Sequence, residues 1–205
     1  MRIFVAGASG VIGVRLVPLL VADGHQVAGM TRSPDKAHSV RALGAEPVVC
    51  DVYDRDRLIE AVQAYEPELV MHQLTDLSDT ADQIPEFRQR NDRMRTEGTR
   101  NLISASKAAG AERFLAQSIA WTPVGGGPAR EEHERAVLDA GGVVVRYGAL
   151  YGPGTYYEAE VPDPPRIHID QAARRTVPLL NASTGVVVLA EEEPSSAGSP
   201  SCWRG

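Results

Sequence analysis

Cysteine and lysine are scarce in this sequence of 205 residues, and no long apolar run occurs in it. Its two cysteines, Cys50 and Cys202, are too few for a structural zinc site or a disulfide framework. We therefore expect no metal, and a reducing cytoplasm as the location. No stretch reaches the roughly 18–20 apolar residues that a membrane span needs. The first residues turn to glycine at once, unlike a secretory signal peptide.

The charged residues point away from nucleic acid and toward a small-molecule partner. The net charge is −6, which argues against a protein that coats nucleic acid. Only Lys36 and Lys107 are lysines among the 21 basic residues, so chemistry that needs a lysine has two candidates. A hydrophobic content of 43% is ample for the core of one globular domain.

Short apolar runs alternate with amphipathic segments of helical length along the chain. We predict strands at residues 3–6, 26–30, 47–50, 69–72, 113–116 and 143–145. We predict helices at residues 11–22, 54–65, 85–109 and 129–140, and a further helix that starts at Ser33 and Pro34. This repetition indicates β-α-β crossovers and therefore an α/β fold, a Rossmann-like doubly wound parallel sheet.

The pattern changes after Tyr151, where Gly152, Pro153 and Gly154 interrupt it. Residues 158–166 contain three prolines and indicate a loop. A short strand that leads into a helix is predicted within residues 167–180, and another strand at residues 185–189. We predict three parts: a dinucleotide-binding domain (1–157), a truncated substrate-binding region (158–190) and a disordered tail (191–205).

A glycine-rich turn is the strongest functional signal. It follows the first predicted strand and opens the first predicted helix, as a dinucleotide fingerprint requires. Gly7 would allow the tight turn, Gly10 the approach of a pyrophosphate, and Gly13 close packing of the helix. The alternative is a tight turn without a ligand. The predicted cofactor-binding residues of this turn are Gly7, Ser9, Gly10, Val11, Ile12 and Gly13.

The residues after the second and third strands favour NADP over NAD. The position where an acidic residue would hold the ribose 2′-OH of NAD is occupied by Arg32, whose guanidinium suits a 2′-phosphate. Lys36 could add charge, although Arg32 could equally be a solvated surface residue. Asp51 and Val52 could meet the adenine edge; Asp51 could equally cap a helix.

The carboxyl ends of the later strands supply further candidates, because they line the ligand crevice of such a sheet. Gln73, Leu74 and Thr75 are predicted to border the cofactor, whereas His72 before them is either a packed strand residue or a catalyst. Ser118 is either a hydrogen-bond donor to a substrate carbonyl or a turn former.

Asn91 shares one face of the long predicted helix with apolar residues at helical spacing. A lone amide among apolar side chains needs a partner. Asn91 therefore either makes a structural hydrogen bond or contacts the substrate.

Together these motifs resemble the NAD(P)-dependent epimerase/dehydratase family, the extended and atypical short-chain dehydrogenases/reductases. The resemblance spans about residues 1 to 157 and rests on four segments. They are the glycine turn, residues 97–102 (EGTRNL), residues 146–155 (RYGALYGPGT) and residues 167–170 (IHID). It implies a Rossmann domain that binds NAD(P)(H), a smaller carboxyl-terminal substrate part and a homodimer paired through two long helices.

The family's Tyr-x-x-x-Lys pair is absent from this chain. If Glu134 aligns with the family's later glutamate, Gly126 replaces the tyrosine and Arg130 replaces the lysine. Glycine cannot move a proton, so we consider other groups. His133 and Glu132 are conceivable substitutes. The predicted catalytic residues are Ser118, Tyr147 and Tyr151.

The substrate region is also short, because only nine residues separate Tyr157 from Ile167. The resemblance places a few dozen residues there. We predict an open cleft that is lined by Asn91, Trp121, Tyr156 and Tyr157.

Three hypotheses follow for the function. The first is an NADP(H)-dependent oxidoreductase or epimerase that acts on a small carbonyl or hydroxyl compound, with a proton donor other than the family's tyrosine. The second is a dinucleotide-binding sensor or partner protein without redox turnover. The third is a non-redox enzyme that dehydrates, cyclises or rearranges its substrate.

Overall fold

A computed structural model of the chain describes residues 1–76, 84–122 and 127–192. Seven parallel strands form one sheet in the order β3-β2-β1-β4-β5-β6-β9. This order confirms the predicted Rossmann-like fold, with the topological switch between β1 and β4. The strands are β1 (Arg2–Ala6), β2 (Gln26–Thr31), β3 (Glu46–Val49), β4 (Leu69–His72), β5 (Arg113–Ile119), β6 (Val143–Tyr147) and β9 (Gly185–Leu189).

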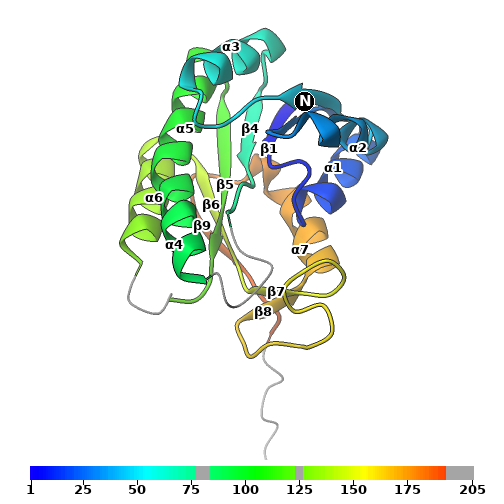
Figure 1. Cartoon of the computed structure of the whole chain (residues 1–205), viewed down its shortest axis with the longest axis vertical. Helices are drawn as coiled ribbons and strands as arrows, with labels where there is room; N and C mark the ends of the chain where they lie inside the picture. Colours follow the sequence, from blue (N-terminus) through cyan, green and yellow to red (C-terminus); the bar gives the residue numbers. More distant parts are fainter. Residues whose placement is uncertain (77–83, 123–126, 193–205) are drawn as a thin grey trace, which may run out of the picture.

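Helices cover both faces of the sheet (Figure 1). One face carries α1 (Gly13–Ala22), α2 (Ala37–Ala42) and α7 (Ile169–Thr176), and its core includes Leu16 and Tyr147. The other carries α3 (Arg55–Tyr65), α4 (Ile84–Arg93), α5 (Thr99–Ala108) and α6 (Pro128–Asp139), and its core includes Leu102 and Val144. The central strands β1, β4, β5 and β6 are buried on both sides, which explains their near-continuous apolar sequences, whereas the edge strands β3 and β9 are partly exposed.

The helical segment at residues 85–109 was predicted as one helix, and the structure divides it. A π-helical turn, η3 (Met94–Gly98), joins α4 to α5. Such turns insert an extra residue into the helix and are frequent at functional sites. The turn changes which side chains face the sheet, so that Met94 and Arg95 are both buried. The periodicity of the sequence did not reveal this change of face.

A small sheet lies beyond the main one, at the lower end of the view in Figure 1. It pairs β7 (Ala149–Tyr151) in parallel with β8 (Arg166–His168). The strand at β8 and the helix after it were predicted, whereas β7 was not. The described residues also form the short 3₁₀ turns η1 (Pro34–Lys36) and η4 (Val177–Asn181). Within the described ranges, no helix is long and apolar enough to cross a membrane.

Candidate nucleotide site and the neighbouring polar network

The glycine turn between β1 and α1 has room only for glycine at two of its positions. Gly7 has a φ of +96°, and a Cβ there would lie 2.8 Å from the backbone carbon and oxygen of Gln73. A Cβ on Gly13 would overlap the carbonyl oxygens of Gly7 and Ala8. The turn therefore brings the start of α1 against the end of β1 and against the residue that follows β4.

Several backbone N–H groups of this turn remain available to a ligand. Gly7 and Ala8 both donate to the carbonyl oxygen of Met30, each at 3.3 Å. The N–H groups of Ser9, Val11 and Ile12 have no acceptor within the part of the chain that the structure describes. They precede α1, whose amino-terminal end attracts negative charge. This geometry fits the diphosphate of a dinucleotide.

Arg15 joins the glycine turn to the carboxyl-terminal part of the chain. Its Nη1 donates to the Val11 carbonyl oxygen at 2.9 Å, and its Nε donates to Asp170 Oδ1 at 2.8 Å. Its Nη2 donates to the carbonyl oxygen of Pro153. A hollow opens here between the glycine turn and Gly154. Sequence reasoning missed Arg15, although Asp170 lies in one of the segments that carry the family resemblance.

The segment after β2 carries the cations Arg32 and Lys36, with the carboxylate of Asp35 between them in the sequence. Arg32 and Lys36 are exposed, and neither makes an ion pair with a described residue. The hydroxyl of Thr31 accepts a hydrogen bond from the Ser33 backbone N–H at 3.3 Å. Both cations are therefore free to meet an anion at this end of the strand.

The segment after β3 is fixed to the long helical segment opposite. Asp51 Oδ1 accepts a hydrogen bond from the Tyr53 backbone N–H at 3.0 Å, while Asp54 caps α3. Of the two roles predicted for Asp51, the helix cap is therefore wrong, and its exposed carboxylate remains a candidate for the adenine edge. The carbonyl oxygen of buried Val52 accepts a bond from Asn101 at 2.9 Å.

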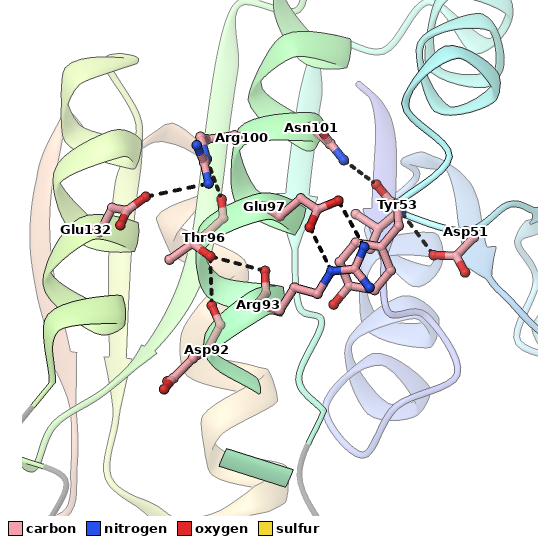
Figure 2. Close-up of polar contacts among 10 residues, drawn as sticks. Asp51, Tyr53, Asp92, Arg93, Thr96, Glu97, Arg100, Asn101 and Glu132 are labelled. Atoms are coloured by element: carbon pink, nitrogen blue, oxygen red, sulfur yellow. Dashed lines mark hydrogen bonds and ion pairs between the residues drawn. The ribbon is translucent and has the colours of Figure 1, made fainter. Parts of the chain in front are cut away.

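Figure 2 shows how the Tyr53 ring is held in this segment. The guanidinium carbon of Arg93 lies 3.9 Å from the centre of the ring, in a cation–π contact. Arg93 also donates two hydrogen bonds to Glu97, at 2.7 and 3.1 Å. The side chain of Arg93 is 56% exposed, so it holds the Tyr53 ring from the surface of the protein.

The residues after β4 lie directly against the glycine turn. The backbone N–H of Gln73 donates a hydrogen bond to the carbonyl oxygen of Ala6 at 2.8 Å. The side-chain amide of Gln73 is buried and has no hydrogen-bond partner among the described residues. Leu74 accepts a bond from Gln117, and Thr75 is exposed. His72 is buried, bonds the Thr99 hydroxyl and has a pKa far below its usual range because of burial. His72 is therefore a packed, neutral strand residue.

The four predicted substrate-binding residues do not form one lining. Asn91 Oδ1 accepts a hydrogen bond from the Asp76 backbone N–H at 3.2 Å. Of the two roles predicted for Asn91, this is the structural hydrogen bond. Trp121 and Tyr156 are 39% and 58% exposed. The rings of Tyr156 and Tyr157 meet edge to face with centres 5.0 Å apart.

The predicted catalytic residues Ser118 and Tyr147 lie on opposite faces of the sheet. Ser118 is buried and donates to Glu134 Oε1 at 2.6 Å, on the α6 side. The Tyr147 hydroxyl lies 2.7 Å from the Thr176 hydroxyl on the α7 side. Burial raises the pKa of Tyr147 to about 12. Neither group is open to a ligand, so the structure does not support the proton-donor roles predicted for them.

Tyr151 lies apart from both, in the small sheet. Its hydroxyl donates to Glu191 Oε1 at 2.5 Å, and this bond raises the pKa of the tyrosine. Its ring meets that of His168 edge to face. The structure therefore does not bring the three predicted catalytic residues together.

A buried polar network occupies the space between β5, β6 and α6. Arg146 binds Glu134 with two hydrogen bonds, at 2.9 and 2.6 Å. Burial alone would raise the pKa of Glu134, but the bonds from Arg146 and Ser118 outweigh it and hold the pKa below its usual value. Both oxygens of the Glu134 carboxylate therefore accept hydrogen bonds from protein side chains.

His133 and Glu132, which were considered as substitutes for the missing tyrosine, both interact with other protein groups. His133 is buried between Thr99 and the Gln117 carbonyl oxygen, and burial lowers its pKa to about 4. Glu132 is exposed and lies 3.9 Å from Arg100 (Figure 2). Gly126, the position proposed to replace the tyrosine, lies outside the described residues.

Comparison with known proteins agrees with this geometry. The model of an NAD(P)H-binding domain family matches residues 7–140. The chain belongs to this NAD(P)H-binding family. The relatives of the chain include reductases and dehydrogenases, and the family binds a nicotinamide cofactor.

Three similar proteins illustrate the relationship. A 3-diazoavenalumate denitrifying reductase from a Streptomyces species is 36% identical over 241 positions, which cover 96% of this chain and 78% of that protein. A 3-beta-hydroxysteroid dehydrogenase from Mycolicibacterium neoaurum is 32% identical over 114 residues, covering 56% of this chain and 31% of that protein. The fold matches UDP-glucose 4-epimerase from Thermus thermophilus in complex with NAD, with a TM-score of 0.78, 19% identity, and 94% and 78% of the two chains covered.

Proposed function

We propose that the protein is an NADPH-dependent reductase whose substrate accepts a hydride without needing a proton from a tyrosine. One observation carries the proposal. The glycine turn fits the cofactor, whereas the acidic and basic side chains at the ends of β5 and β6 are hydrogen-bonded within the protein. Ser118, Glu134 and His133 are all buried and hydrogen-bonded within the protein. Tyr147 is buried on the opposite face of the sheet.

In this proposal, each part of the cofactor has residues that would hold it. The N–H groups of Ser9, Val11 and Ile12 would hold the diphosphate, and Arg32 with Lys36 would hold a 2′-phosphate. Asp51 would accept a hydrogen bond from the adenine amine. The bound cofactor would supply a hydride.

A site without a proton donor suits a substrate that loses a leaving group when it accepts the hydride, because its product needs no proton. Reduction of a carbonyl creates an alkoxide, which must be protonated. An aryl diazonium differs, because addition of a hydride and loss of dinitrogen leave an aryl C–H bond and require no proton. The resemblance to a denitrifying reductase that acts on a diazo compound supports this class. We therefore propose a diazo-bearing aromatic substrate.

The test mixes the protein with NADPH and a hydroxybenzoate that carries a diazo group, and follows NADPH absorbance and dinitrogen release. We expect one dinitrogen for each NADPH consumed, and no consumption with a panel of aldehydes and ketones. Turnover of carbonyl compounds at a comparable rate would contradict the proposal. Tight NADPH binding without any turnover would favour the sensor instead, and chemistry that persists without nucleotide would favour a non-redox enzyme.

A further inference from the structure

Arg95 is a buried arginine without an acidic partner. It lies in the π-helical turn η3 and is only 7% exposed. No hydrogen bond or ion pair joins its guanidinium to any described residue. Arginines are rarely buried unless they are paired, because an unpaired buried charge carries a large desolvation cost.

The charged groups near Arg95 do not neutralise it. Burial lowers its pKa, the charge of Arg130 lowers it further, and Asp92 and Glu134 raise it. Asp92 is exposed, whereas Glu134 is already bound to Arg146 by two hydrogen bonds. The neighbouring histidines His72 and His133 have lowered pKa values and are neutral at pH 7. Positive charge therefore remains in excess here.

Arg130 contributes a second guanidinium with unused donors. It lies in the first turn of α6, the helix against which η3 packs. Its Nη1 donates to the carbonyl oxygen of Trp121 at 3.1 Å, while its Nε is buried without a partner in the described part of the chain. The side chain of Trp121 is 39% exposed. Arg130 is thus held at Trp121, two residues past β5, and Arg95 lies on the turn η3 that packs against the same helix α6.

We propose that Arg95 and Arg130 form a binding site for the carboxylate of an aromatic acid, which is the substrate of the reductase. A carboxylate offers two oxygens to guanidinium donors and supplies the missing negative charge. The ring of the acid would lie against Trp121. The proposal rests on the proposed function only for calling this acid the substrate.

Binding of a simple probe tests the site without any turnover. Calorimetry with NADPH present compares cinnamate with methyl cinnamate, which has nearly the same shape but no charge. We expect the wild-type protein to prefer the acid by about tenfold or more, as hydrogen bonds to a charged group would give. Arg95→Gln should lose this preference. Arg135→Gln, which changes an exposed arginine on α6, should keep it.

Three further measurements keep the test decisive. Arg95→Gln should unfold at a higher temperature than the ligand-free wild type, because it removes an unpaired buried charge. Should Arg95→Gln fail to fold, Arg130→Gln carries the same binding test. NADPH affinity should be unchanged in both variants; a selective loss of NADPH binding would assign the guanidinium groups to a cofactor phosphate and overturn the proposal.

Equal affinity of the wild type for acid and ester would also overturn it. These outcomes are separate from those of the proposed function. Loss of the acid preference with diazo reduction intact rejects only the anion site. An acid preference without reduction rejects only the reductase.

Discussion

The nucleotide side of the sheet (β1 to α3) and the opposite side (β5 to α6) differ in what their polar groups do. Beside the glycine turn, the exposed Arg32 and the N–H group of Val11 have no hydrogen-bond partner among the residues that the structure describes. On the inner side of α6, His133 and Glu134 are buried and bonded to other protein groups, as in Glu134 with Arg146. Cofactor binding and proton transfer are thus separate properties of this fold, and a chain can keep the first while replacing the groups of the second.

The largest effect should come from a side chain at Gly13. A valine there would overlap backbone oxygens of the turn, so we expect Gly13→Val to weaken NADPH binding by about a hundredfold or more. Fluorescence titration with NADPH measures it. Gly24→Ala is the control, because its φ of +81° strains any added side chain but no atom lies within 4 Å of the added Cβ. Equal binding by both variants would show that the turn does not hold the cofactor.

Acid should destabilise the α6 side through His133. The unfolded state takes up a proton near the usual histidine pKa of 6.5, whereas folded His133 does so only at about 4. The unfolded state therefore binds more protons between these values, and stability falls as the pH falls from 6.5 to 4. The loss for this histidine is about 3 kcal/mol.

Urea unfolding of the wild type and of His133→Gln across this pH range checks the prediction. The variant should lose much of the dependence, leaving the part due to His72, whose pKa is lowered in the same direction. His38→Gln, at an exposed position, should behave as the wild type. A flat wild-type profile would mean that His133 is not buried in solution.

A charge reversal at Arg32 should change the choice of cofactor. We expect Arg32→Asp to weaken NADPH binding by about ten- to a hundredfold and to leave NADH binding equal or better. Calorimetry with each nucleotide measures this, and Arg41→Asp on α2 is the control. NADH and NADPH affinities that fall together in Arg32→Asp would argue for a general loss of structure and against contact with a 2′-phosphate.

The smallest effects should come from the hydroxyl groups first considered for catalysis. If no tyrosine or serine donates a proton, Ser118→Ala, Tyr147→Phe and Tyr151→Phe should keep the rate of hydride transfer within about twofold in single-turnover experiments. A loss of about a hundredfold or more in Tyr151→Phe, with NADPH binding unchanged, would instead make this tyrosine the proton donor.

The sequence predicted the sheet and the glycine turn because both depend on local signals. Apolar runs such as residues 143–145 are long enough to mark buried strands, and Gly7 stands where a strand meets a helix. The topology of a parallel sheet then indicated that the residues directly after each strand line the ligand crevice. The sequence therefore placed Arg32 and Gln73 directly after β2 and β4, and their contact with a cofactor stays a prediction.

The buried polar network could not be predicted in the same way. Arg95 is buried because a π-helical turn shifts the helix face, and a period of 3.6 residues misses this shift. The partners of Ser118 and Arg146 come together through Glu134 on another element. Only the parity of positions along β5 and β6 hinted that Ser118 and Tyr147 point to opposite faces.

Deuterium transfer is the most direct test of hydride delivery without a tyrosine acid. NADPH carrying deuterium at the transferable C4 position is mixed with the diazo-bearing hydroxybenzoate and the protein in ordinary water. We predict deuterium at the ring carbon that lost dinitrogen, at a rate unchanged by Tyr151→Phe. Hydrogen from water at that carbon, with no deuterium transferred, would contradict it.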